Sequence, residues 1–185
     1  MVASGWFWLV LAVLIFWGVG AYRRLLALRS TVNKQFAVLE EVLLKFQGLV
    51  QEATTAAVTA PGGWQTAVAP ELGASHWTRL QVAANLSAMA MARMQEHPLD
   101  PSSSKALVAT SRDLQAAWEN LTHPDTYYVS VPEELTTRWK ELTIVVQPDI
   151  QRFNQAVQNY NEAIDLFPAS WMARALQFTP GRPLE

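Results

Sequence analysis

Residues 6–17 read WFWLVLAVLIFW, and the surrounding stretch from residue 2 to residue 22 contains no charged side chain. A helix rises about 1.5 Å per residue, so 20 such residues span about 30 Å, the hydrocarbon thickness of a bilayer. Backbone polar groups in lipid must bond to one another, and a helix achieves this within one segment. The stretch therefore predicts a transmembrane helix, and we assign residues 1–22 to an anchor.

Aromatic residues at both ends of this stretch favour the same interpretation. Trp6 and Trp8 lie near one end, and Trp17 and Tyr22 lie near the other. Such rings combine an apolar body with a polar edge and are enriched where a bilayer meets water. Two alternatives fit less well. A cleaved signal peptide carries a positive region before its apolar run, and a buried core helix is seldom apolar all round for this length.

Basic residues follow the apolar stretch directly. Arg23 and Arg24 come first, Arg29 and Lys34 follow, and the first acidic residue is Glu40. Positive flanks are retained in the cytoplasm, so this asymmetry predicts an N-terminus outside and a cytoplasmic domain after a single membrane crossing. The lipid bilayer is thus the first expected partner. Arg23 and Arg24 are also placed to contact anionic lipid head groups.

An apolar stripe continues after the basic residues without a helix breaker. Its members step by three or four residues, which places them on one coiled-coil-like face of a helix. Gly48 weakens such a helix by about 1 kcal/mol relative to Ala but does not end it. One helix is therefore expected to run from the membrane to about residue 59. The stripe consists of Leu25, Leu28, Val32, Phe36, Leu39, Leu43, Phe46, Val50, Ala53 and Ala57.

Further helical segments follow, and two prolines define their limits. Asp100 before Pro101 is a strong start signal, because Asp caps a helix and Pro suits its first position. Pro148 is expected to kink or briefly break the last long helix, since it removes a hydrogen bond and crowds the preceding turn. The expected helices are 74–96, about 101–121, about 130–167 and a short one at about 169–177, with loops at 60–75 and 127–131.

These segments predict an all-α protein in which the N-terminal transmembrane helix continues into an antiparallel bundle of long helices. The bundle domain is expected at residues 23–178. Residues 179–185 are expected to form a flexible tail, since they follow the last apolar pattern. No strand and turn pattern supports a sheet.

No residue pattern predicts catalysis, a cofactor or a metal. The net charge is −2 and there is no cysteine, which argues against a nucleic-acid-binding face and excludes disulfides and thiolate chemistry. The three histidines, His76, His97 and His123, do not share the spacing of a zinc pair on one helix. No phosphate-binding loop or nucleophile motif is present. We therefore expect a non-enzyme without cofactor, metal or nucleic-acid partner.

The most specific local pattern is RFNQAVQNYNEAIDLFP at residues 152–168. Asn154 and Asn161 are seven residues apart, so they share one stripe of the helix, where each can hydrogen-bond a loop or another helix. With YRRL at residues 22–25, this pattern resembles the LemA family of bacterial proteins. That family has two Tyr-Asn pairs seven residues apart, then an Ile and a Phe-Pro. The matching positions here are Phe153-Asn154, Tyr160-Asn161, Ile164, Phe167 and Pro168.

The resemblance covers residues 5–52 and 150–178, and the middle of the chain departs from the family. The usual Pro-Asn-Leu-Val of the first long helix is represented only by Gln47-Gly48-Leu49-Val50, so the chain looks like a divergent member. The resemblance implies an N-terminal anchor in the bacterial inner membrane, a bundle of long helices and a domain usually assigned to the cytoplasm. It implies no defined molecular activity.

Two hypotheses about function remain open. The first is a membrane-anchored scaffold or assembly protein, which binds other proteins or itself through the bundle surface. The second is a small-ligand or signal-sensing domain with a pocket between helices. The Ala-rich helix at 74–96 motivates the second, because small residues beside Trp77, Trp118 and Trp139 can leave a cavity. Met89, Met91 and Met94 form either an adaptable groove or ordinary core.

Overall fold

The structure is a computed structural model that describes residues 2–59, 70–123, 131–166, 170, 173–174 and 176–184. Every regular element in those ranges is helical, which confirms the prediction of an all-α chain. Of the short helix expected at about 169–177, residues 170, 173 and 174 are helical, whereas residues 176 and 177 form a turn in which Gln177 has a φ of 56°. The loops expected around 60–69 and 127–130 lie outside the described residues. The long helices are α1 (Val2–Thr59), α2 (Pro70–Glu96), α3 (Pro101–Leu121) and α4 (Glu133–Asp165).

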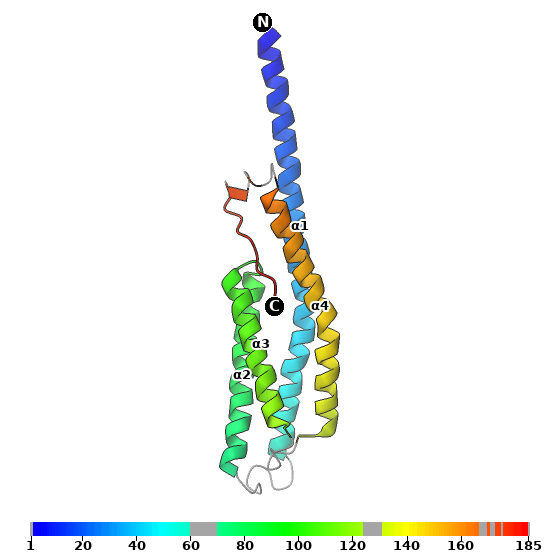
Figure 1. Ribbon diagram of the computed structural model, residues 1–185, viewed down its shortest axis with the longest axis vertical. Coiled ribbons are helices and arrows are strands. Elements are labelled where there is room, and N and C mark those ends of the chain that lie inside the picture. The colour runs from blue at the N-terminus through cyan, green and yellow to red at the C-terminus, as the bar shows by residue number, and fades with distance from the viewer. Residues whose placement is uncertain are drawn as a thin grey trace.

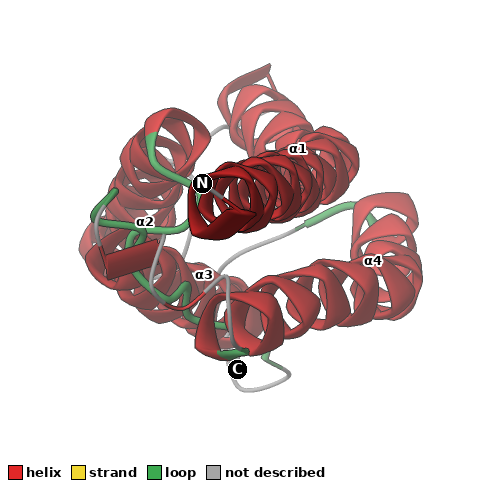
Figure 2. Ribbon diagram, turned by 90° about the horizontal axis from the view of Figure 1, so that it is seen from above, coloured by secondary structure: helices red, strands yellow, loops and turns green. Residues whose placement is uncertain are grey.

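Successive helices run in opposite directions along the long axis of the molecule (Figure 1). Seen along that axis, the four helices lie side by side as one group (Figure 2). The helix α1 packs mainly on α4, α2 packs mainly on α3, and α1 also contacts α2. By contrast, no Cα atom of α3 lies within 8 Å of one in α4. Contacts between α3 and α4 are therefore made by side chains.

The helix α1 is continuous over 58 residues, which corresponds to about 87 Å. Its N-terminal part projects beyond the other helices (Figure 1), and it is long and apolar enough to cross a membrane. The first buried side chain is Leu25, which is 1% exposed. From there the expected stripe packs against the other helices. Its fully buried members are Leu25, Val32, Phe36, Leu39, Val50 and Ala53, and the other four are partly buried.

The helices α2 and α3 form an antiparallel hairpin. The helix α2 begins at Pro70, four residues earlier than expected. The helix α3 begins at Pro101 as expected. Its cap is Asp100, whose carboxylate accepts hydrogen bonds at 3.2 Å from the backbone N–H groups of Ser102 and Ser103. Hydrogen bonds from these two serines lower the pKa of Asp100 from 3.8 to about 2.

The helix α4 runs through Pro148 without a break, so the alternative of an interruption at this residue is wrong. The helix leans toward α1 beyond its middle (Figure 1), as expected where a proline crowds the preceding turn. The next residue, Asp149, is buried beside α4's own Arg152, whose guanidinium donates to its carboxylate at 2.6 Å.

The core consists of two side-chain clusters. We call the one that contains Phe36 and Phe153 the upper cluster and the one that contains Trp118 and Trp139 the lower cluster. In the upper cluster, Phe36 of α1 meets Phe153 of α4 edge to face at 6.0 Å between ring centroids. In the lower cluster, Trp139 of α4 stacks on Trp118 of α3 at 4.3 Å and 7°. The ring of Phe46 from α1 packs edge-on against Trp139 at 4.7 Å. These aromatic contacts connect α4 to α3 although their backbones lie apart.

Candidate functional site: the α4 asparagines, the C-terminal segment and the adjoining cavity

Two asparagines of α4 bind the backbone of the C-terminal segment. The side-chain amide of Asn154 donates to the carbonyl oxygen of Leu184 at 2.9 Å, and its oxygen accepts from the N–H of Leu184 at 2.7 Å. Asn161 makes the same pair of bonds with Gly181, both at 2.8 Å. Each asparagine thus satisfies both polar groups of one backbone residue, as a neighbouring β-strand does.

The spacing of the two asparagines matches the spacing of the residues they bind. Seven residues of helix rise about 10.5 Å. Three residues of extended chain, from Gly181 to Leu184, cover about 10 Å. Both pairs of bonds can therefore form at once without distorting either segment. The hydroxyl of Tyr160 adds a longer hydrogen bond to the carbonyl oxygen of Thr179 at 3.3 Å.

A flexible tail was expected at residues 179–185, and these bonds join residues 179, 181 and 184 of that stretch to α4. The segment lies along α4 because Asn154 and Asn161 satisfy its backbone and because the side chain of Leu184 is buried. Gly181 lies close to its neighbours, since a Cβ atom there would lie 2.7 Å from a methyl carbon of Leu99 and 3.1 Å from one of Val157, so a larger residue requires the Leu99 side chain to shift. The asparagine side chains contact a backbone that lies 20 to 30 residues later in the sequence. Such contacts form only when the chain is folded.

The other predicted family-motif residues of α4 face the core or lie outside the described residues. Tyr160 is buried, and its loss of hydration raises the pKa of its phenol, an effect that the charge of Arg29 opposes. Ile164 is buried in the upper cluster. Phe167 and Pro168 lie outside the described residues. The motif resemblance thus contains two different kinds of position, those that pack the core and those that bind the C-terminal segment.

A cavity of about 210 Å³ lies beside the C-terminal segment. It occupies the space between α1, α3 and α4, where the backbones of α3 and α4 are far apart. Leu184 forms part of its wall, so the residue that Asn154 holds also bounds the cavity. The apolar residues that line it are Leu39, Leu43, Phe46, Leu107, Val108, Leu114, Trp139, Val146, Ile150 and Leu184.

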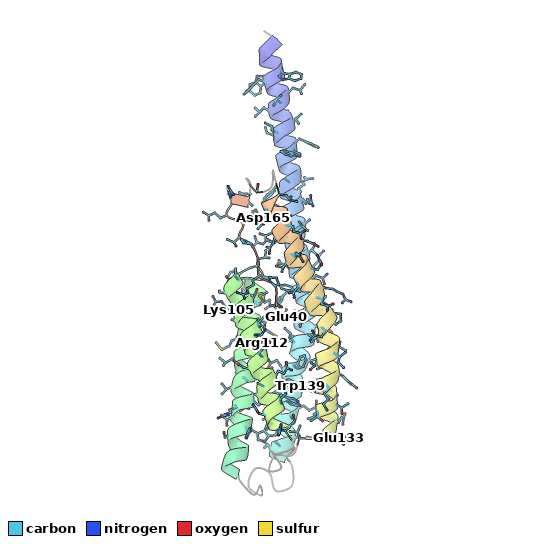
Figure 3. The ribbon with its side chains drawn as sticks, viewed as in Figure 1. Glu40, Lys105, Arg112, Glu133, Trp139 and Asp165 are labelled. Carbon is cyan, nitrogen blue, oxygen red and sulfur yellow. The ribbon has the colours of Figure 1, made fainter. Side chains whose placement is uncertain are left out.

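Polar side chains also line this cavity, and Gln115 of α3 and Thr143 and Gln147 of α4 are among them. Ser111 and Arg112 come from α3, and Ser87 comes from α2. Figure 3 shows Arg112 on α3 and Trp139 on α4, both in the lower half of the molecule. Among the described residues that line the cavity, Arg112 is the one with a charged side chain. An apolar space with a few polar groups is the usual composition of a small-molecule site.

The cavity differs from the one that the sequence suggested. Trp139 lines it, but Trp77, Trp118 and the alanines of α2 do not. The three methionines do not gather into a groove either, because Met91 and Met94 are buried whereas Met89 is exposed. The sequence does contain one sign of the observed cavity. The polar residues Ser111 and Arg112 stand between apolar positions of α3.

The residues expected at the membrane all lie on the projecting part of α1. Trp6, Trp8, Trp17 and Tyr22 are exposed, and so are Arg23 and Arg24. The two arginines stand directly before Leu25, where burial begins. The change from an exposed apolar surface to a packed helix therefore coincides with the basic residues.

The described part of the chain contains no group of three or more potential metal ligands. His76 lies on α2, and His97 and His123 lie directly after α2 and α3. Comparisons with protein-family models, with curated proteins and with solved structures found no match to this chain. Its function is therefore argued from its own residues.

Proposed function

We propose that this chain is a LemA-like, single-pass membrane protein of the bacterial inner membrane whose helical domain acts as a scaffold or assembly protein in the cytoplasm. The proposal divides the chain into an anchor at residues 1–22 and a bundle domain at 23–178. The C-terminal segment follows this domain in the sequence and is bound to it through α4.

One observation carries the proposal, namely the abrupt change in burial along an unbroken helix. Phe16 is 83% exposed, whereas Leu25 is 1% exposed, and both belong to α1. A contiguous exposed apolar surface of this length requires a lipid or protein environment, and the basic residues that follow suit a cytoplasmic membrane surface. A continuous helix then holds the bundle at a fixed distance from that surface, which suits assembly better than diffusion on a tether.

Topology mapping tests the location. A reporter that is active only in the cytoplasm, fused after residue 185, is expected to be active in membrane-bound full-length protein. A reporter active only after export is expected to be silent at the same position. The reverse pattern would place the domain outside and remove the cytoplasmic assignment.

Chemical cross-linking in intact membranes tests the scaffold role. The full-length chain is expected to form a cross-linked product with itself or with a second protein through the bundle surface. Recovery of only the uncross-linked monomer, from cells and from solubilised membranes alike, would count against assembly as the function.

The cavity favours a second candidate, a small-ligand or signal-sensing domain tethered to the membrane. A ligand there would touch α1, α3, α4 and Leu184 together. Its binding would therefore act on the packing between the two helix pairs, which is the property a sensor needs. The test is the unfolding midpoint of the full-length protein in the presence of small apolar or amphipathic compounds. If none of these compounds changes the midpoint, this candidate is removed.

A further inference from the structure

We propose that the cavity between α1, α3 and α4 binds a small amphipathic carboxylate, with its apolar part against the leucines and valines and its carboxylate on Arg112. This inference deepens the second candidate function and is independent of the membrane anchor. Three features of the cavity carry it: its size, its one cation and its unpaired buried hydroxyl.

The size and lining of the cavity define the apolar part of the ligand. Side chains such as Leu43, Leu107, Val146 and Ile150 offer no hydrogen bonds, so the guest that they favour is hydrocarbon. An apolar cavity of about 150 Å³ holds benzene, which has six carbon atoms. By the same ratio, a cavity of about 210 Å³ holds about eight non-hydrogen atoms. That is one aromatic ring or a short alkyl chain.

The cation defines the charged group of the ligand. Arg112 is exposed and has no hydrogen-bond or ion-pair partner among the described residues, so its guanidinium is available to a ligand in the adjoining cavity. No acidic side chain lines the cavity in the described part of the chain. A guanidinium presents parallel N–H donors that fit a carboxylate bidentately. The electrostatic complement of this cavity is therefore an anion with two oxygens on one carbon.

A buried serine gives an independent sign of a polar guest. Ser87 lines the cavity from α2, is 3% exposed and has no hydrogen-bond partner within the described ranges. A side-chain hydroxyl in a helix usually donates a hydrogen bond to a preceding backbone carbonyl oxygen, as Thr143 does to Trp139 at 2.9 Å. Leaving a buried hydroxyl unpaired is costly, so the Ser87 side chain points to an acceptor that enters the cavity.

Helix register places this serine beside the proposed carboxylate site. Ser87 lies nine residues before the end of α2 at Glu96, and Ser111 lies ten residues after the start of α3 at Pro101. Because the two helices form an antiparallel hairpin, the two serines lie at the same level, next to Arg112. Together they place two hydroxyl groups near Arg112, while most of the remaining lining is apolar, which matches an amphipathic anion.

Calorimetric titration of the full-length protein in lipid nanodiscs tests the inference. The test ligands are phenylacetate, whose ring and methylene group supply seven carbons, and its neutral amide, phenylacetamide. Empty nanodiscs correct for partition into lipid. Phenylacetate is expected to bind about tenfold more tightly than the amide, in line with the strength of a charged hydrogen bond. Arg112→Gln is expected to abolish this preference, and the matched control Arg79→Gln, on the exposed surface of α2, is expected to keep it.

A blocking variant separates this cavity from other sites. Val108→Phe fills the space from α3 at a partly buried position and is expected to abolish binding of both compounds. Equal affinities for the two compounds in the unmodified protein, or a preference that survives Arg112→Gln, would overturn the carboxylate assignment while leaving ligand binding in place. Unchanged binding to Val108→Phe would overturn the choice of cavity. Absence of binding by both compounds would overturn this inference, whereas the second candidate function would be removed only by the wider unfolding test described above.

Discussion

Replacing Asn154 by Ala is expected to release the C-terminal segment from α4. The substitution removes the bonds of 2.7 and 2.9 Å that hold both backbone polar groups of Leu184. A hydrogen bond contributes about 0.5–1.5 kcal/mol net, so the loss of two weakens the attachment by about 1–3 kcal/mol. That corresponds to a roughly five- to 150-fold increase in the open population of the segment.

Amide hydrogen exchange of the full-length protein in nanodiscs measures this population. The Leu184 amide is expected to exchange faster by that factor in Asn154→Ala, while amides of the lower cluster keep their rates because the effect is local. Asn159→Ala is the matched control. Asn159 is exposed on the same helix and accepts only from Gln155 at 3.0 Å, so its loss is expected to change stability by less than about 0.5 kcal/mol. Equal exchange of the Leu184 amide in the two variants would refute the role assigned to Asn154.

Three further outcomes are expected. Trp139→Ala removes the ring that stacks on Trp118 at 4.3 Å and is expected to destabilise the protein by about 3–5 kcal/mol in denaturant unfolding, with a smaller loss for Trp139→Phe. Asp100→Ala is expected to lower the unfolding midpoint at neutral pH. Because folding lowers the pKa of Asp100 from 3.8 to about 2, its contribution is fully present above its unfolded pKa, so the difference between the two proteins shrinks as pH falls through this range. Replacing Arg23 and Arg24 together by Glu removes the first positive charges after the apolar stretch and is expected to shift the C-terminal reporters toward the exported pattern.

The helices and their packed faces follow from local sequence patterns. Leu25, Val32, Phe36 and Leu39 follow one another at steps of seven, four and three residues, and they are buried. The start of α3 follows from Asp100 and Pro101, because a cap and a first-turn proline act within a few residues. The early start of α2 had a comparable signal, since Pro70 stands at its first position.

The C-terminal contacts and the cavity depend on tertiary geometry and leave weaker traces. Asn154 and Asn161 present the same pattern whether they face water or an extended chain, and their partners lie 30 and 20 residues away. The cavity arises from the distance between α3 and α4, which no side-chain periodicity encodes. The alanines of α2 do not line this cavity, and α2 packs mainly on α3.

Because α1 is continuous, the number of its residues also fixes how far the bundle is rotated about the helix axis relative to the N-terminal segment. A helix turns about 100° for each residue. With residues 2–22 held in a bilayer, as proposed, one residue inserted at Arg24 rotates the whole bundle about its axis by about 100° and raises it by about 1.5 Å. Seven inserted residues nearly restore the original facing at a height about 10 Å greater. The number of residues in α1 thus determines the direction in which the cavity and the C-terminal segment face. Partners must bind in that orientation.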